Sequence, residues 1–195
     1  MIIIKHRVNT IQALSETSTH FGVEIDIRSQ DGDLILAHDP FINGVNFELW
    51  LNTYNHQFLV LNVKEDGLEE KLMEKLSKYS IENYFFLDQA FPSLYKVSRL
   101  FPSKCAVRVS DVESSQTALS LKPGWVWLDS HSGDWSYLLE SIKVVRELGM
   151  KICLVSPELQ RFDYKKEMFS LQQLLLNNNL ELDAVCTKLP TNWLF

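Results

Sequence analysis

Short apolar runs recur along the whole chain at nearly regular intervals, and this repetition constrains the fold more than any other feature of the sequence. Each run ends near a polar residue, and most are followed by a stretch with the apolar spacing of a helix. The pattern predicts eight strands, at residues 2–6, 23–28, 58–64, 84–88, 105–109, 125–129, 151–156 and 183–187. Strands that alternate with helices form parallel sheets, so we expect an α/β protein.

The number of strand–helix units indicates how the sheet is arranged. Helical patterns are expected at residues 10–20, 47–54, 68–79, from 92 onward, 114–121, around 138–145 and at about 164–178. A tight-turn signal at Asp31-Gly32 predicts a short extra strand over residues 34–38. Eight units favour a compact (β/α)8 TIM barrel over an open doubly wound sheet. With 195 residues the chain is short for this barrel, so we expect a single domain, residues 1–195, with some brief helices.

Composition and charge exclude several classes of protein. The hydrophobic fraction of 46% supports a real core, and the net charge of −6 without any run of Lys or Arg argues against a nucleic-acid surface. Cys105, Cys153 and Cys186 are far apart in apolar runs, so we expect buried, reduced thiols rather than metal ligands. No apolar run has the length of a membrane span or the form of a secretory signal, which predicts a soluble cytoplasmic protein.

Polar side chains gather at the carboxyl ends of the expected strands, where barrels of this type hold their active sites. Because side chains alternate along a strand, the polar members should face the barrel interior and the apolar members the helices. The polar set comprises His6 and Arg7 after the first strand, Glu24 and Asp26 in the second, His38 and Asp39 after the extra strand, Asn62 and Lys64 in the third, and Arg108 in the fifth.

The acidic members of this set suit a hard divalent cation. Glu24 and Asp26 are two residues apart on one strand face, and Asn62 adds an oxygen donor from the next strand. We expect these three residues to bind Mg²⁺ or Ca²⁺, which would neutralise a phosphate oxygen. The competing structural explanation is a buried ion-pair network with Arg28 and Lys64, although burying several charges for stability alone is costly.

The basic members suit the cleavage of a phosphate ester. His6 and His38 could divide the proton transfers, one as base and one as acid. Arg7 could bind the phosphate through two donors, and Lys64 could add a point charge. Further candidates for substrate contacts are Arg108 and, in the loop after the sixth strand, Trp135.

These motifs resemble those of the glycerophosphodiester phosphodiesterase family, a branch of the phospholipase C-like phosphodiesterase barrels. The matches are His6-Arg7, Asn9-Thr10, Glu24-x-Asp26, Asp31-Gly32 and His38-Asp39, with weaker matches at Asn62-x-Lys64 and in the closing stretch 183–190. The resemblance implies a barrel that hydrolyses a small phosphodiester of lipid metabolism to an alcohol and a phosphomonoester. It also implies that His6 and His38 are the acid/base pair, Glu24 and Asp26 metal ligands, and Arg7 and Lys64 phosphate contacts.

The chain departs from the family pattern in three places. Val8 and Asn9 follow Arg7 directly, so the loop that usually shapes the phosphate pocket is short. Asn62 stands where the family has a third metal carboxylate, and the insertion that usually caps the substrate is absent, which predicts a shallow, open site.

Two other functions therefore stay open. One is a catalytically degenerate barrel that binds a phosphorylated ligand, and the other is a metal-independent lyase that forms a cyclic phosphate. The sequence also leaves open the alcohol part of the substrate, the identity of the metal and the oligomeric state.

Overall fold

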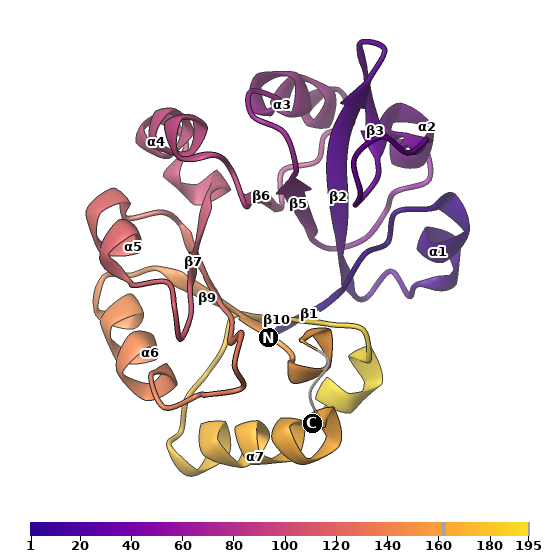
Figure 1. Cartoon of the computed structure of the whole chain (residues 1–195). Helices are drawn as coiled ribbons and strands as arrows, with labels where there is room; N and C mark the ends of the chain where they lie inside the picture. Colours follow the sequence, from indigo (N-terminus) through magenta and orange to yellow (C-terminus); the bar gives the residue numbers. More distant parts are fainter. Residues whose placement is uncertain (161–162, 195) are drawn as a thin grey trace.

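The computed structural model describes residues 1–160 and 163–194, and its strands form a barrel surrounded by helices (Figure 1). The parallel strands are β1 (Ile2–Lys5), β2 (Gly22–Gln30), β5 (Leu59–Val63), β6 (Tyr84–Leu87), β7 (Ala106–Val109), β8 (Trp125–Leu128), β9 (Lys151–Val155) and β10 (Ala184–Thr187). They pair in this order, and β10 pairs with β1. Between β6 and β7 the pairing is reduced to one bridge, Phe86–Cys105. The predicted TIM-barrel fold is confirmed.

Helices follow the strands on the outside of the barrel (Figure 1). They are α1 (Ile11–Glu16), α2 (Phe47–Leu51), α3 (Glu69–Lys78), α4 (Phe91–Leu100), α5 (Gln116–Leu121), α6 (Leu138–Glu147) and α7 (Tyr164–Asn177), with 3₁₀ turns η1 (Pro102–Lys104), η2 (Pro157–Leu159) and η3 (Pro190–Trp193). Three helices have six residues or fewer, as the short chain predicted. In the part of the chain that the structure describes, no helix has the length and apolarity needed to cross a membrane.

The first helix is shorter than the predicted stretch 10–20. The Thr10 side chain caps its start by accepting a hydrogen bond from the Ala13 N–H at 3.0 Å. The helix ends at Glu16, and the next residue, Thr17, has extended backbone. The Thr17 carbonyl is bound by the His56 Nε2 at 3.0 Å, so this oxygen is taken by another segment and not by a further helical turn.

The second half of β2 leaves the barrel and forms a hairpin with β3 (Asp33–Leu36). Asp31 and Gly32 both have positive φ, 51° and 88°, as the predicted two-residue turn requires. A short strand that the sequence did not predict, β4 (Val45–Asn46), then pairs with β3. A Cβ on the preceding Gly44 would lie 2.6 Å from the Leu36 carbonyl oxygen, so this close return requires glycine. The loop between β3 and β4 is thus anchored at both ends.

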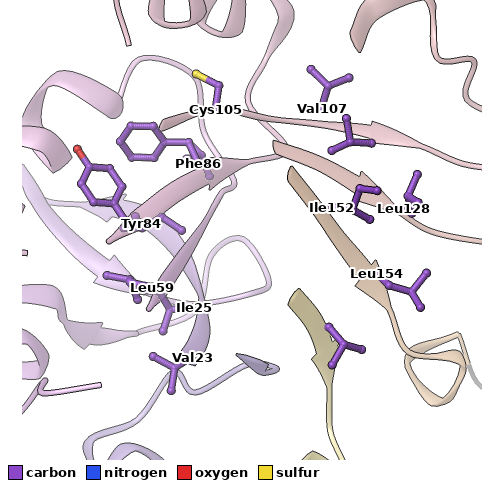
Figure 2. Close-up of a cluster of buried hydrophobic side chains, with 14 of the residues drawn as sticks. Val23, Ile25, Leu59, Tyr84, Phe86, Cys105, Val107, Leu128, Ile152 and Leu154 are labelled. Carbon is purple, nitrogen blue, oxygen red and sulfur yellow. The ribbon is translucent and has the colours of Figure 1, made fainter. Parts of the chain in front are cut away.

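The apolar core has two parts. One lies between the strands and the helices, and Figure 2 shows its outward-facing strand residues, such as Ile25, Phe86 and Leu128. The other lies inside the barrel, where the ring centroids of Phe58, Phe85 and Trp125 are 5.0 to 5.6 Å apart. These rings lie at or near the amino ends of their strands. They fill that end of the barrel and leave the opposite end for polar side chains.

Candidate active site

A cavity of about 240 Å³ lies at the carboxyl ends of the barrel strands. Its lining residues are His6, Arg7, Glu24, His38, Asn62, Lys64, Leu87, Asp88, Arg108, Trp127, Asp129, Val155, Leu159 and Gln160. The structure thus brings most of the predicted site residues to one place. Their chemical roles stay predictions.

Strand register explains why the acidic residues meet the amide of Asn62. In the parallel pair β2–β5, Asp26 stands opposite Asn62. Glu24 and Asp26 lie on the same face of β2 because alternate residues of a strand point to the same side. Both side chains are almost fully buried, with exposures of 1% for Glu24 and 0% for Asp26.

Arg7 turns the chain sharply as it leaves β1. Its φ of 56° lies in the left-handed region, where a residue other than glycine is strained and which is over-represented at functional sites. The turn directs the Arg7 N–H to Glu24 Oε2 at 2.7 Å. The Arg7 Nε lies 3.8 Å from Asp26 Oδ2, and the side chain remains 44% exposed. Arg7 therefore holds Glu24 with its backbone N–H, while its guanidinium lies near Asp26 and stays accessible to an anionic ligand.

Asn9 also holds Asp26, a role that the sequence analysis did not assign. The Asn9 Nδ2 donates to Asp26 Oδ2 at 2.8 Å, and the Asn9 Oδ1 accepts from the Asp26 backbone N–H at 2.9 Å. The signal for this contact is the Asn9-Thr10 motif itself, in which the first residue orients a carboxylate and the second caps α1.

Several buried oxygens in this cluster lack ordinary partners. Glu24 Oε1 and Asn62 Oδ1 have no hydrogen-bond partner of ordinary geometry among the described residues, although the Asn62 side chain lies close enough to Glu24 to act on its pKa. Asp26 Oδ1 has an ion pair with Lys64 Nζ at 3.3 Å. Unpaired buried acceptors are rare in native proteins. Carboxylate and amide oxygens are the ligands that Mg²⁺ and Ca²⁺ prefer, so this donor set fits a hard divalent cation.

This donor set includes the amide of Asn62, so it is not a cluster of His, Cys, Asp and Glu side chains alone. Within residues 1–160 and 163–194, no group of three His, Cys, Asp or Glu side chains is placed to hold a metal. The third oxygen donor here is the amide of Asn62, which carries no charge. A cation at this position would be bound by two carboxylates, and we expect weaker binding than at a site with three.

Burial and neighbouring charge shift the pKa values of Glu24 and His6. Burial, followed by the charge of Asp26, raises the pKa of Glu24 to about 7. Burial, followed by the charge of Arg7, lowers the pKa of His6 to about 3, so its imidazole is neutral near pH 7. The His6 Nε2 lies 3.8 Å from Glu24 Oε2. The cluster therefore holds a neutral base beside a carboxyl group that titrates near neutrality.

His38 reaches the cavity from the loop after β3. Its Nδ1 lies 2.7 Å from Asp39 Oδ1, and this hydrogen bond keeps the pKa of Asp39 below its ordinary value. An ionised carboxylate can only accept, so Nδ1 carries the proton and Nε2 is the nitrogen left for the cavity.

The competing explanation, a buried ion-pair network of Glu24 and Asp26 with Arg28 and Lys64, holds only in part. Lys64 pairs with Asp26, but Arg28 Nη1 lies 3.5 Å from Glu65 instead.

The opposite wall of the cavity is built around Arg108. Its Nη2 lies 2.5 Å from Asp88, its Nη1 binds Asp129 and its Nε is 3.7 Å from Glu113. Gln160 donates to Asp129 Oδ1 at 2.6 Å. A phosphate would compete with these carboxylates for the guanidinium. No sequence signal marked Gln160, which lies in the short segment after β9.

Trp135 is not among the residues that line the cavity. Its ring stacks on that of Tyr137 with centroids 6.5 Å apart and packs against the core between strands and helices. The predicted substrate contact for Trp135 thus has no support from the cavity. The three predicted free cysteines, in contrast, are buried thiols as expected.

The similarity of this chain to known proteins lies in its structure and not in its sequence. No family model matches the sequence, and no curated protein matches it. Solved structures do. A glycerophosphodiester phosphodiesterase from Parabacteroides distasonis has a TM-score of 0.70 and 17% identity, covering 97% of this chain and 93% of that one.

Two further structures have similar scores. A glycerophosphodiester phosphodiesterase from Thermotoga maritima has a TM-score of 0.65 and 16% identity, over 96% of this chain and 94% of that chain. A phosphodiesterase from Oleispira antarctica in complex with the product sn-glycerol-3-phosphate has a TM-score of 0.68 and 17% identity, over 97% and 94%. This chain therefore has the barrel fold of these phosphodiesterases over almost its whole length.

Proposed function

We propose that this protein, acting as a single domain over residues 1–195, is a phosphodiesterase that hydrolyses a glycerophosphodiester-like compound. The observation that carries the proposal is the cavity lined by both imidazoles, His6 and His38, together with Glu24 and the cations of Arg7 and Lys64. Asp26 is buried behind this lining and pairs with Lys64. Its fold is that of glycerophosphodiester phosphodiesterases and of a phosphodiesterase that was solved with the product sn-glycerol-3-phosphate. In the proposed reaction the oxygen of water forms a new P–O bond while the P–O bond to the alcohol breaks; the water loses a proton, and the leaving oxygen takes up a proton to give the free alcohol.

The chain's own groups account for binding and proton transfer. The exposed guanidinium of Arg7 contacts the phosphate, and Lys64 adds positive charge beside it. One imidazole accepts the proton of the attacking water while the other returns a proton to the leaving oxygen. His38, with its Nδ1 fixed by Asp39, presents one defined nitrogen for this exchange.

Glu24, Asp26 and Asn62 would hold a divalent cation in this proposal. Its support is the set of buried oxygens that no described residue pairs by a hydrogen bond. When bound, the cation neutralises charge on a phosphate oxygen. We place the enzyme in the cytoplasm and in lipid metabolism, because its thiols are free and buried and because the proposed substrates derive from phospholipids.

The test is hydrolysis of bis(p-nitrophenyl) phosphate and glycerophosphodiesters with Mg²⁺, Ca²⁺ or Mn²⁺, with and without a chelator. We expect turnover that depends on the cation and stops when a chelator removes it. The Glu24→Gln variant should need a higher cation concentration for half-maximal rate. Turnover that a chelator leaves untouched would favour the cyclising lyase, and binding without turnover under any condition would favour the degenerate barrel.

The raised pKa of Glu24 predicts that cation affinity increases with pH. A cation binds the ionised carboxylate, and with a pKa of about 7 only about one tenth of Glu24 is ionised at pH 6, against about nine tenths at pH 8. The apparent dissociation constant for Mg²⁺ should therefore be about tenfold lower at pH 8 than at pH 6. Calorimetric titration at both pH values measures this change.

The raised pKa of Glu24 also determines how the stability of the cation-free protein changes with pH. Between about pH 4.5 and pH 7 the folded chain keeps a proton on Glu24 that the unfolded chain has lost, so this group favours folding at low pH and the benefit is lost as the pH rises towards 7. Glu24→Gln should remove this contribution. An affinity for Mg²⁺ that is equal at pH 6 and pH 8 would place the cation away from Glu24.

A further inference from the structure

Arg28 connects the hairpin to the loop that carries His38. Its guanidinium donates two hydrogen bonds to the His38 carbonyl oxygen, from Nε at 3.2 Å and from Nη2 at 3.1 Å. The third nitrogen, Nη1, lies 3.5 Å from Glu65 Oε1. The Arg28 side chain is only 16% exposed, so these contacts are shielded from solvent. Arg28 lies on the same face of β2 as Glu24 and Asp26, because it follows Asp26 by two residues along the strand.

The loop around His38 has few other attachments. One residue before it, the Ala37 N–H donates to the Asp26 carbonyl at 3.1 Å. Beyond His38 the loop extends into solvent: Phe41 is fully exposed, and its φ is 62°. Among the described residues, the hydrogen bonds found for the His38 main chain are those from Arg28. Further along the loop, Gln30 Nε2 donates to Asn43 Oδ1 at 2.9 Å. Next to the imidazole itself, the main chain is therefore tied to β2 by two contacts, those of Ala37 and Arg28.

We propose that Arg28 is a positioning residue for His38: it fixes the loop so that the imidazole, already oriented by Asp39, faces the cavity. This inference rests on the proposed phosphodiesterase reaction, in which His38 transfers a proton. A planar guanidinium with two donors on one carbonyl restrains both the position and the direction of that peptide group. Proton transfer needs hydrogen-bond geometry, and a displacement of about 1 Å can cost about 100-fold in rate.

The experiment replaces Arg28 in two steps and uses two matched controls. Arg28→Met removes all the donors, and Arg28→Lys keeps the charge but can donate at most singly to the His38 carbonyl. Glu65→Gln removes the charge partner of Arg28 and leaves the His38 contacts. Arg146→Met removes an arginine that likewise binds a carbonyl, Glu181 O at 2.7 Å, and a carboxylate, Asp183 at 2.8 Å, at the amino end of β10.

The measured quantities are kcat and KM for bis(p-nitrophenyl) phosphate, amide exchange of residues 37–39 and the imidazole ¹⁵N signals of His38. We expect Arg28→Met to lower kcat by about 10- to 100-fold with KM changed by less than about threefold. Arg28→Lys should fall between it and the parent. Amide exchange should rise at residues 37–39, and both controls should keep parental kcat and His38 signals.

Two results would overturn this inference separately from the proposed function. If Arg28→Met keeps the parental kcat and its His38 signals and exchange rates do not change, Arg28 does not position the imidazole. If the parent protein hydrolyses no phosphodiester, the proposed function fails, and the exchange and imidazole measurements still decide whether Arg28 holds His38 in place.

Discussion

Replacing His6 or His38 with alanine should lower kcat for phosphodiester hydrolysis by about 10²- to 10⁴-fold, the range that general acid–base catalysis supplies. Both side chains line the cavity, and each is held in a defined environment: His6 beside Glu24 and His38 against Asp39. Removal of either imidazole deletes one of the two proton transfers. Steady-state kinetics on bis(p-nitrophenyl) phosphate measures the loss, and circular dichroism and thermal melting verify the fold.

His20→Ala is the matched control for these two variants. His20 is exposed and lies outside the cavity, so its replacement should leave kcat unchanged. A well-folded His6→Ala or His38→Ala protein with parental kcat would remove that residue from the mechanism. An equal loss in both variants, with no further loss in the double variant, would show that the two imidazoles act as a unit.

Replacing Arg108 with methionine should lower the free energy of unfolding by about 3–5 kcal/mol, the cost of breaking a buried ion pair by removing one partner. The side chain of Asp129 is 2% exposed and that of Asp88 is 28% exposed, and both bind the Arg108 guanidinium. Without that cation, the buried carboxylate of Asp129 keeps only neutral donors such as Gln160. Denaturant titration of the parent and the variant measures the difference.

Two further variants separate this effect from its alternatives. Adding Asp129→Asn to Arg108→Met should recover part of the lost stability, because a neutral amide does not need the cation. Lys78→Met, which breaks an exposed ion pair with Glu74, should cost less than about 1 kcal/mol. If Arg108→Met is as stable as the parent and only KM rises, Arg108 contacts substrate and the sequence-based assignment of this residue holds.

The fold was predictable because each level of the sequence pointed to the same result. The apolar runs placed every barrel strand to within one residue of its observed ends, apart from β2, which extends two residues further, to Gln30, as part of the hairpin. The Asp31-Gly32 turn was predictable because few residue pairs tolerate positive φ at both positions. The end of α1 was not, because it depends on His56, a residue 39 positions further along the chain from Thr17.

The candidate site was predictable where it follows strand alternation and not where it follows loops. Alternation alone places Glu24, Asp26, Asn62 and Lys64 in the barrel interior. Gln160 was not predicted, because its partner, the distant carboxylate of Asp129, is set by tertiary packing. Arg28 was considered only as a member of an ion-pair network, and its contact with the His38 carbonyl was not foreseen for the same reason. The cavity does not support the prediction for Trp135, whose ring packs against the outer core, because an apolar ring in a loop can cover either surface.

The polar wall of the cavity also joins β6 to β7, two strands whose backbone pairing is weak. Asp88 directly follows β6 and Arg108 belongs to β7, so their ion pair joins two neighbouring strands that share a single backbone bridge among the described residues. The Asp88–Arg108 ion pair therefore links β6 and β7 through side chains, where few backbone hydrogen bonds join the two strands. Closure of the barrel and the shape of the cavity at its carboxyl end therefore both involve the Asp88–Arg108 pair, and we expect a substitution at either residue to affect both.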